Sequence, residues 1–290
     1  MKIAIIGPNV NNPPLLEEAK AIFDEVLYVP LNSVKLEVDE DQKVFYEDVD
    51  LSSFDLIIPL PYEENREFMF LCLKMLEKDV YIPFSSMDFF IIENDALMKK
   101  KLINSGLNVR KSAILASNRT SRMLIENLKF PIIVRSLSRK GVRATNEETL
   151  KSVLDLFKAG YIRILEKPIE AKSVIWCFVV GDEIIASFEE TKESTRSIRI
   201  DTETESKLLK IRTAINSDYF VINFIKKGNG LIVNDIYLNP DFSKFKEITG
   251  NNVSETLLIY LKNKVESMRV GPITLFMNSL YDTVKKLWKT

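Results

Sequence analysis

Residues 230–253 read GLIVNDIYLNPDFSKFKEITGNNV, and they follow directly on YFVINFIKK at residues 219–227. Both stretches are rich in β-branched and aromatic residues, and they meet at the Gly-Asn-Gly sequence of residues 228–230. This pattern predicts an antiparallel hairpin. A second hairpin is predicted for SVIWCFVVGDEIIASFEE at residues 173–190, with its turn at Gly181 and Asp182. The second half of the chain is therefore expected to contain an antiparallel sheet.

Helices are expected on either side of the 219–237 hairpin. ESKLLKIRTAIN at residues 205–216 and VSETLLIYLKNKVESM at residues 253–268 both have apolar positions at helical spacing.

The first 86 residues show a different pattern, because short apolar runs alternate there with helical segments. The runs KIAIIG, LYVPL, FDLIIPL and VYIPF predict a small parallel sheet with helices on its faces.

The segment between these two halves is compact and mixed. Residues 88–107 predict one helix that stops near Gly106, and residues 120–129 predict another. RKSAILA at 110–116 and FPIIVRS at 130–136 predict strands. A further helix is expected over residues 145–160, with Thr145 and Glu148 as a capping box.

The composition excludes several kinds of chemistry. The 290 residues include no histidine, so zinc sites and catalytic triads that depend on imidazole are excluded. Forty basic and 41 acidic residues give a net charge of −1, and a basic stripe for nucleic acid is not evident. Two cysteines in apolar runs, Cys72 and Cys177, predict buried thiols in a reducing compartment, with one disulfide between them as the alternative, and we expect a cytoplasmic protein. No apolar run reaches the length of a membrane-spanning helix.

Six stretches in this order resemble the RimK-like branch of the ATP-grasp superfamily, and they cover most of residues 1–265. They are DLIIPLP with VYIPFSS, ENDALMKKKLINSGLNV, FPIIVRSLSRKGV, ILEKPI, CFVVGDEIIA and GLIVNDIYLNPDFSKFKEITGNNV. The last stretch is similar, without a gap, to the family's metal-binding strand and the helix start that follows it.

The resemblance implies an α/β (α+β) protein with the ATP-grasp fold. It divides the chain into an open parallel α/β pre-ATP-grasp domain at 1–86, a small central α+β subdomain at 87–165, and an antiparallel C-terminal α+β subdomain at 166–268. An amphipathic helical tail follows at 269–290, with an apolar stripe over residues 273–288. This extra C-terminal helix is expected to dock on the chain's own body or on a second subunit. A protein partner or a lipid surface are the alternatives.

The resemblance also implies a site for ATP. At the position of the family's strand lysine the chain has Arg135, which keeps the positive charge. Ser138, Lys140 and Gly141 correspond to the loop that covers the phosphates, although a solvated basic turn would have the same composition. A second phosphate lysine corresponds to Asp95 or Ala96, and Lys99–Lys101 lie one turn later.

The adenine linker corresponds to Glu166, Lys167 and Ile169, although a strand that enters an irregular connection explains these residues equally well. For magnesium, the matching positions are Asn223, Asp235 and Tyr237. Only Asp235 is a carboxylate, and Asn223 offers an amide oxygen, whereas a phenol is a poor magnesium ligand.

Arg196 and Arg199 correspond to the family's basic segment that faces the transferred phosphate, and they are the catalytic candidates. A solvated loop explains both residues equally well. The matching acid and arginine on the first hairpin are replaced by Val174 and Trp176.

Two functions are then open. The first is an ATP-dependent carboxylate–amine ligase that forms an acyl phosphate and adds an amino acid, such as glutamate, to a small molecule or a protein terminus. The second is a catalytically degenerate ATP-grasp scaffold that serves as a binding or regulatory module.

Overall fold

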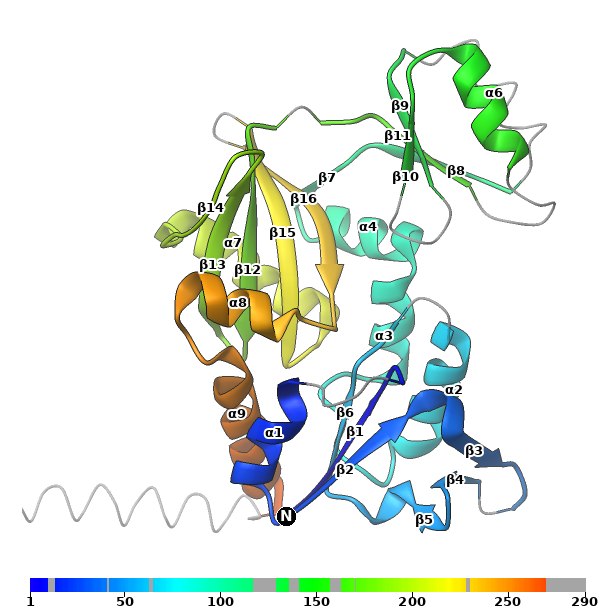
Figure 1. Ribbon diagram of the computed structural model, residues 1–290, viewed down its shortest axis with the longest axis vertical. Coiled ribbons are helices and arrows are strands. Elements are labelled where there is room, and N and C mark those ends of the chain that lie inside the picture. Colours follow the sequence, from blue (N-terminus) through cyan, green and yellow to red (C-terminus); the bar gives the residue numbers. More distant parts are fainter. Residues whose placement is uncertain are drawn as a thin grey trace, which may run out of the picture. The chain divides into compact units, whose positions relative to one another are not determined.

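The computed structural model (Figure 1) describes residues 1–9, 14–40, 42–62, 65–116, 129–135, 141–156, 163–169, 171–227 and 230–269. The chain forms two compact units. One contains Met1–Ser86 with Asp241–Lys246 and the chain from Gly250, and the other contains Met87–Pro240 with Glu247–Thr249. The predicted tail helix at 273–289 lies outside the described residues. The four-part division of the chain stays a prediction.

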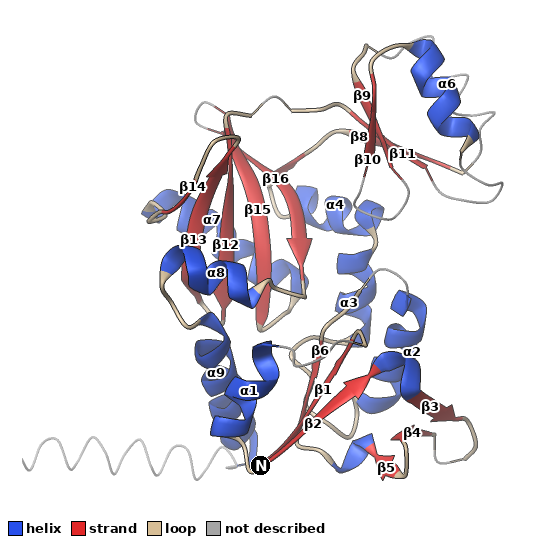
Figure 2. Ribbon diagram, viewed as in Figure 1, coloured by secondary structure: helices blue, strands red, loops and turns tan. Residues whose placement is uncertain are grey.

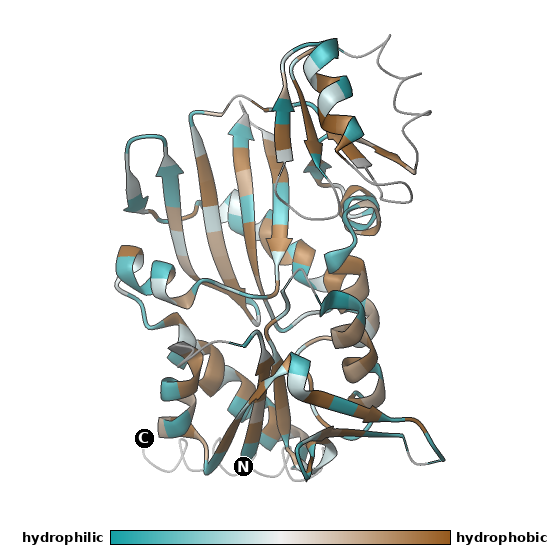
Figure 3. Ribbon diagram, turned by 45° about the vertical axis from the view of Figure 1, so that its right-hand side comes forward, coloured by the Kyte–Doolittle hydropathy of each residue, from teal (hydrophilic) through white to brown (hydrophobic). Residues whose placement is uncertain are grey.

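The first unit contains the parallel sheet that the alternating pattern predicts. Strand β1 (Lys2–Gly7) lies between β2 (Glu25–Pro30) and β6 (Leu56–Pro59), and it is parallel to both. Ile3, Ile5 and Ile6 are fully buried, and Figure 3 shows these strands mostly in the hydrophobic colour. Burial on both faces explains why β1 and β6 are continuous apolar runs, whereas the edge strand β2 is only partly buried.

Helices and a small second sheet complete this unit. The helices are α1 (Pro14–Ile22), α2 (Arg66–Leu76) and α9 (Val253–Arg269). Helix α9 lies against α1, where Lys262 Nζ donates a hydrogen bond to the Ile22 carbonyl at 2.9 Å. The antiparallel sheet of β3 (Val34–Glu37), β4 (Lys43–Tyr46) and β5 (Val49–Asp50) was not expected from the sequence. The expected strand at 80–84 is reduced to one bridge between Tyr81 and Leu56.

The second unit is built on two sheets (Figure 2). The six-stranded sheet has the order β14-β13-β12-β15-β16-β7, and the four-stranded sheet has the order β10-β9-β11-β8. The six-stranded sheet contains β7 (Asn108–Val109), β12 (Ser173–Val180), β13 (Glu183–Thr191), β14 (Thr195–Ser197), β15 (Tyr219–Lys227) and β16 (Gly230–Tyr237). Both predicted hairpins are therefore present, as β12–β13 and β15–β16.

The four-stranded sheet contains β8 (Ser112–Leu115), β9 (Ile132–Arg135), β10 (Gly141–Ala144) and β11 (Arg163–Glu166). Its strands are antiparallel to their neighbours. The helices of this unit are α3 (Ser86–Glu93), α4 (Asp95–Asn104), α6 (Glu147–Asp155) and α7 (Thr202–Ile215), whereas α8 (Phe242–Thr249) is divided between the two units. Figure 2 shows α6 beside the four-stranded sheet and α7 behind the six-stranded one.

Two helix starts differ from the prediction. The single helix expected over 88–107 is divided into α3 and α4, because the Asn94 side chain accepts a hydrogen bond from the Leu97 amide at 3.2 Å and so caps a new helix. In α6 the cap is Asn146 rather than Thr145, since Asn146 Oδ1 accepts from the Thr149 amide at 2.8 Å.

The buried, free Cys72 and Cys177 confirm the prediction of thiols. Within the described residues, no helix is both long and apolar enough to cross a bilayer.

Removal of the Asn94 cap should weaken α4. Asn94→Ala leaves the Leu97 amide without its side-chain acceptor, and we expect the free energy of unfolding to fall by about 1 kcal/mol. Urea denaturation measures the change. Asn104→Ala, at the exposed other end of the same helix, is the control and should stay within about 0.5 kcal/mol of wild type. Equal stabilities of the two variants would contradict a capping role for Asn94.

Candidate active site

The four-stranded sheet has one apolar face and one charged face. Ile132 and Val134 on β9 pack with Leu165 of β11 in a core whose other members are Leu115, Ala144, Leu150, Val153 and Leu154. Successive side chains of a strand point to opposite faces. Arg135 on β9 and Glu166 on β11 therefore lie on the face opposite this core, together with Ser112, Gly141 and Arg143.

Register brings these polar residues close together. Arg135 lies opposite Gly141 on one side and Ile164 on the other, while Glu166 lies opposite Ser112. Glu166 is two residues from Ile164 along β11, so it is the diagonal neighbour of Arg135 on the same face. Arg135 Nε donates to Glu166 Oε2 at 3.2 Å, and Nη2 donates to Oε1 at 3.0 Å. The pair is bidentate, the geometry that suits a guanidinium and a carboxylate best.

Helix α4 adds two opposite charges to this face. Asp95 and Lys99 are four residues apart, so they lie on one side of the helix, with Lys99 Nζ 2.9 Å from Asp95 Oδ2. Lys99 Nζ also donates to Glu166 and, at 3.1 Å, to Ser112 Oγ. Asp95 Oδ1 accepts from Arg135 Nη2 at 2.6 Å. The four side chains of Asp95, Lys99, Arg135 and Glu166, which we call the ionic cluster, form a closed set of alternating charges.

The side chains of the ionic cluster are largely shielded from solvent. Side-chain exposure is 3% for Glu166, 6% for Arg135, 11% for Lys99 and 13% for Asp95. Burial alone would raise the pKa of Glu166, but hydrogen bonds from Arg135 and Lys99 and their charges outweigh it and lower that pKa. Burial alone would lower the pKa of Arg135, yet Glu166 and Asp95 raise it overall. Both groups therefore stay ionised.

Arg110 joins the cluster to the six-stranded sheet. It follows β7 and precedes β8, where the chain passes from one sheet to the other. Its guanidinium lies 3.5 Å from Glu166 Oε2 and donates to the Asn234 side chain on β16. Asn234 is an extra residue in its strand, because Asn223 pairs with Asp235 while Phe224 pairs with Val233. This bulge turns Asn234 toward Arg110.

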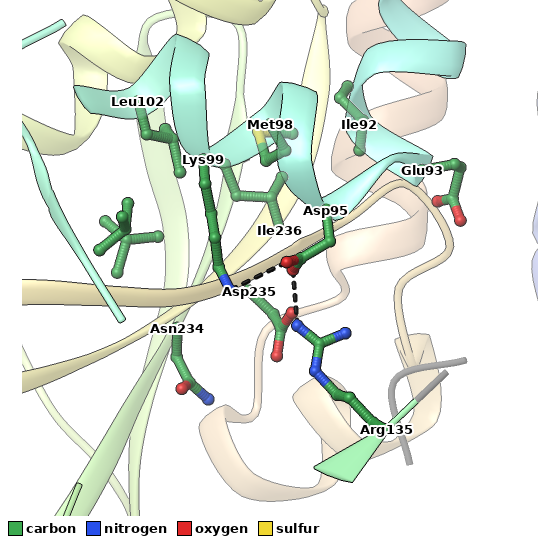
Figure 4. Close-up of a pocket in the computed structure, with 12 residues that line it drawn as sticks. Ile92, Glu93, Asp95, Met98, Lys99, Leu102, Arg135, Asn234, Asp235 and Ile236 are labelled. Carbon is green, nitrogen blue, oxygen red and sulfur yellow. Dashed lines mark hydrogen bonds and ion pairs between the residues drawn. The ribbon is translucent and has the colours of Figure 1, made fainter. Parts of the chain in front are cut away.

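Two of the cavities that adjoin the ionic cluster contain Arg135 in their lining. The smaller one, of about 20 Å³, is lined by Asp95, Lys99, Arg135 and Asp235 with apolar residues of α3, α4 and β16. Figure 4 shows the Asp95 and Asp235 carboxylates and the Arg135 guanidinium pointing toward one another. The larger one, of about 290 Å³, is open to solvent. Its lining is Arg110, Ile133, Arg135, Gly141, Arg143, Glu166, Pro168, Asn234 and Asp235. Three arginines against two carboxylates favour an anion there.

The larger cavity gathers four of the residues predicted for the site, Arg135, Gly141, Glu166 and Asp235. Gly141 leaves room for its neighbours, since a Cβ atom at this position would lie 2.6 Å from Ile133 Cγ2. Lys167 is exposed and Ile169 half-buried just after β11. Ser138 and Lys140 lie outside the described residues. The roles of these residues stay predictions.

The predicted metal residues are neighbours in the six-stranded sheet. Asn223 and Asp235 face each other on β15 and β16, and Asn223 Oδ1 accepts from the Asp235 amide at 2.9 Å. Tyr237 stacks on Trp176, with ring centroids 5.7 Å apart. In the part of the chain that the structure describes, no three His, Cys, Asp or Glu side chains gather as a metal site. One carboxylate and one amide oxygen fit a magnesium ion that takes its other ligands from phosphates and water.

Arg196 and Arg199 lie elsewhere. Arg196 is on edge strand β14, four strands from β16, which is about 19 Å at the usual strand spacing. Its side chain is 72% exposed and pairs with Glu189 at 2.7 Å. Arg199 is also exposed. The structure does not bring these two arginines to the cavity beside Arg135, and their catalytic role stays a prediction.

The sequence did not single out Arg110 and Arg143 as site residues. Arg143 was detectable in principle, because it lies two residues after Gly141 on a strand and so shares its face. No sequence pattern around Arg110 indicates that it belongs to the site, because its position depends on where the chain passes from one sheet to the other.

Comparisons with known proteins agree with this architecture. The RimK-like ATP-grasp domain matches residues 93–261. A "Probable alpha-L-glutamate ligase" of Haemophilus influenzae is 20% identical over 232 residues, which cover 73% of this chain and 77% of the relative.

Solved structures show the same fold. A RimK domain ATP-grasp protein from Sphaerobacter thermophilus superposes with a TM-score of 0.71 at 13% identity and covers 90% of this chain and 99% of its own. The ATP-grasp ligase PsnB, complexed with minimal precursor, Mg and ADP, superposes with a TM-score of 0.68 at 13% identity over 91% of this chain and 98% of its own.

The ionised state of Glu166 should make stability depend on pH. Its pKa is lower in the fold than in the unfolded chain, where the pKa of a glutamate is about 4.3. Its contribution is then complete above this pH and is lost as the pH falls through the folded pKa. Glu166→Gln should cost about 3–5 kcal/mol at neutral pH, and this deficit should shrink on acidification.

Urea denaturation of both proteins between about pH 6 and pH 3 measures this difference. Glu203→Gln on α7 is the matched control, because Glu203 forms an exposed pair with Lys207. We expect this control to stay within about 0.5 kcal/mol of wild type throughout. A Glu166→Gln deficit that does not change with pH would mean that Glu166 is not held ionised by the cluster.

Proposed function

Because the chain belongs to the RimK-like ATP-grasp family, we propose that it works as an ATP-dependent carboxylate–amine ligase and holds the nucleotide phosphates beside Arg135. The observation that carries this proposal is the open cavity in which Arg110, Arg135 and Arg143 outnumber the carboxylates. Family membership favours the ligase over the alternative of a binding scaffold. In the implied reaction, the terminal phosphoryl group of ATP moves to a carboxylate, and an amine then displaces it.

The chain's own residues supply charge and shape for this reaction. Arg135 presents a planar set of donors that can neutralise phosphate oxygens, and its low exposure strengthens each contact. Gly141, opposite Arg135, carries no side chain, so a phosphate can approach the backbone of β10 closely. Glu166, which lines the same cavity, accepts two hydrogen bonds from Arg135 and thereby fixes its orientation.

We propose that magnesium binds beside Asp235, which lines the cavity. Asp235 offers the carboxylate and Asn223 the amide oxygen, and a carbonyl oxygen that accepts one hydrogen bond keeps a second lone pair. Magnesium is commonly held by one or two carboxylates together with substrate phosphates. We therefore expect the ion to bind with the nucleotide and only weakly without it.

The amine acceptor is proposed as a small molecule or a protein terminus, and the added group as an amino acid such as glutamate. Two resemblances support this range. The curated relative is called a glutamate ligase, and the PsnB structure contains a precursor as well as a nucleotide. A cytoplasmic location, where ATP and reduced thiols are found, fits the buried Cys72 and Cys177.

Nucleotide affinity should depend on Arg135. Arg135→Ala removes a charge-assisted contact, and we expect ADP to bind more weakly by about 1.5–3 kcal/mol, or about 10- to 150-fold. Isothermal titration calorimetry measures the change. Arg135→Lys keeps the charge but loses the planar fork, so its affinity should lie between those of wild type and Arg135→Ala. Arg212→Ala, which removes an arginine that pairs with Asp182 on another surface, should bind ADP as wild type does. Unchanged binding by Arg135→Ala would refute the assignment.

Magnesium should act through Asp235. In wild type we expect magnesium to tighten ADP binding, and in Asp235→Asn this gain should largely disappear because the carboxylate is lost. Titrations of both proteins with ADP, each with magnesium and with a chelator, measure the effect. The chelator arm is the internal control, since metal-free ADP should bind Asp235→Asn at least as tightly as wild type once a negative charge is removed from the cavity. A full magnesium effect in Asp235→Asn would place the metal elsewhere.

A further inference from the structure

Asp95 occupies charge contacts that a phosphate would need. Its Oδ1 accepts a hydrogen bond from Arg135 Nη2 at 2.6 Å, and its Oδ2 forms an ion pair with Lys99 Nζ at 2.9 Å without the geometry of a hydrogen bond. Both cations are also bound by Glu166. In this arrangement each positive charge of the ionic cluster is already neutralised by a carboxylate. A phosphate that entered now would meet the charge of Asp95 without gaining the donors that Asp95 holds.

Arg135 connects the two cavities. It lines both the open cavity of about 290 Å³ and the small one of about 20 Å³, whereas Asp95 lines only the small one. Asp95 and an anion in the open cavity would therefore contact Arg135 from different sides. An arginine has five donors, but Nη2 is already shared between Asp95 and Glu166. An anion that accepts a hydrogen bond from Nη2 then competes with Asp95.

Asp95 is the weaker of the two internal partners. Glu166 makes two hydrogen bonds to Arg135 and one to Lys99, and its side chain is 3% exposed on a strand in the middle of the sheet. Asp95 makes one contact to each cation, is 13% exposed, and lies in the first turn of α4. The contact to Asp95 should therefore yield first when a stronger anion arrives.

We propose that Asp95 is an internal anion that holds Arg135 and Lys99 in the absence of nucleotide, and that nucleotide phosphate takes its place. This inference rests on the proposed function. Asp95 then lowers the affinity for every phosphate ligand, because its contacts must be broken first. It also favours ligands with several negative charges, since only these can compete with a carboxylate that is already in contact.

The test is to remove the charge of Asp95 and measure phosphate binding. Asp95→Asn keeps the shape, and we expect both ADP and inorganic pyrophosphate to bind at least about 10-fold more tightly than to wild type. Asp88→Asn is the matched control, because Asp88 lies on the neighbouring helix, is nearly buried and contacts Lys101 at 3.2 Å. The control should bind both ligands as wild type does.

The outcomes separate this inference from the proposed function. If wild type binds ADP in a manner that depends on Arg135 but Asp95→Asn binds it no more tightly, only the role of Asp95 is refuted. If neither protein binds ADP, both proposals fail. If Asp95→Asn alone binds, Asp95 closes the site as proposed. A gain with Asp88→Asn as large as with Asp95→Asn would reduce the effect to net charge and overturn the inference.

A second variant and a second measurement protect the test against misfolding. Asp95→Ser keeps a residue that suits a helix start and also removes the charge. Without ligand, both variants should melt at a lower temperature than wild type, because Arg135 and Lys99 lose a partner. Pyrophosphate should raise the melting temperature of the variants more than that of wild type. An equal or smaller rise in both folded variants would contradict the proposal.

Discussion

The buried carboxylate of Glu166 sets the constraint on which the site depends. A charge removed from water costs several kcal/mol unless cations and hydrogen bonds compensate it. Glu166 obtains this compensation from Arg135 on the neighbouring strand and from Lys99 on α4. Because the two cations come from different elements, the same interaction that keeps Glu166 ionised also fixes α4 against the four-stranded sheet. Geometry at the candidate site and stability of the fold are thus coupled through one side chain.

Side chains of a β-strand alternate between its two faces, and this explains how the same short strands supply both an apolar core and a charged site. On β9, Ile132 and Val134 face α6, while Arg135 faces the cavities. On β11, Leu165 belongs to the same core and Glu166 to the ionic cluster. A shift of one residue in either strand would bury the charges in the apolar core, which is strongly unfavourable. The apolar contacts with α6 therefore determine the register, and the register positions the charges.

Much of the fold could be predicted from local pattern, and so could part of the site. The two hairpins around residues 181–182 and 228–230 followed from apolar runs and turn residues, and family resemblance led to Arg135, Gly141, Glu166 and Asp235, which line one cavity. The contacts of Asp95 and Lys99 with that group could not be foreseen, since they depend on how α4 meets a sheet formed later in the chain. Asn94 divides one predicted helix into two because a side-chain cap outweighs a continuous apolar pattern. Arg196 matched the family in sequence, yet its strand lies at the far edge of the sheet.

The identities of residues 95 and 135 make physical sense only when they are considered together. A lysine at position 135 would present a compact ammonium, whereas Arg135 presents a planar fork that reaches Glu166 and Asp95 at once. The carboxylate at position 95 in turn needs such a fork, because Lys99 is already shared with Glu166 and Ser112. Two carboxylates and two cations then balance inside a site that is almost dry. A balanced cluster is stable without a ligand, so in the proposed exchange an entering phosphate takes the place of the Asp95 carboxylate. When a phosphate replaces the Asp95 carboxylate, the number of charge contacts to Arg135 and Lys99 stays nearly constant. The affinity for the phosphate then depends on how much more strongly these two cations bind a phosphate than a carboxylate.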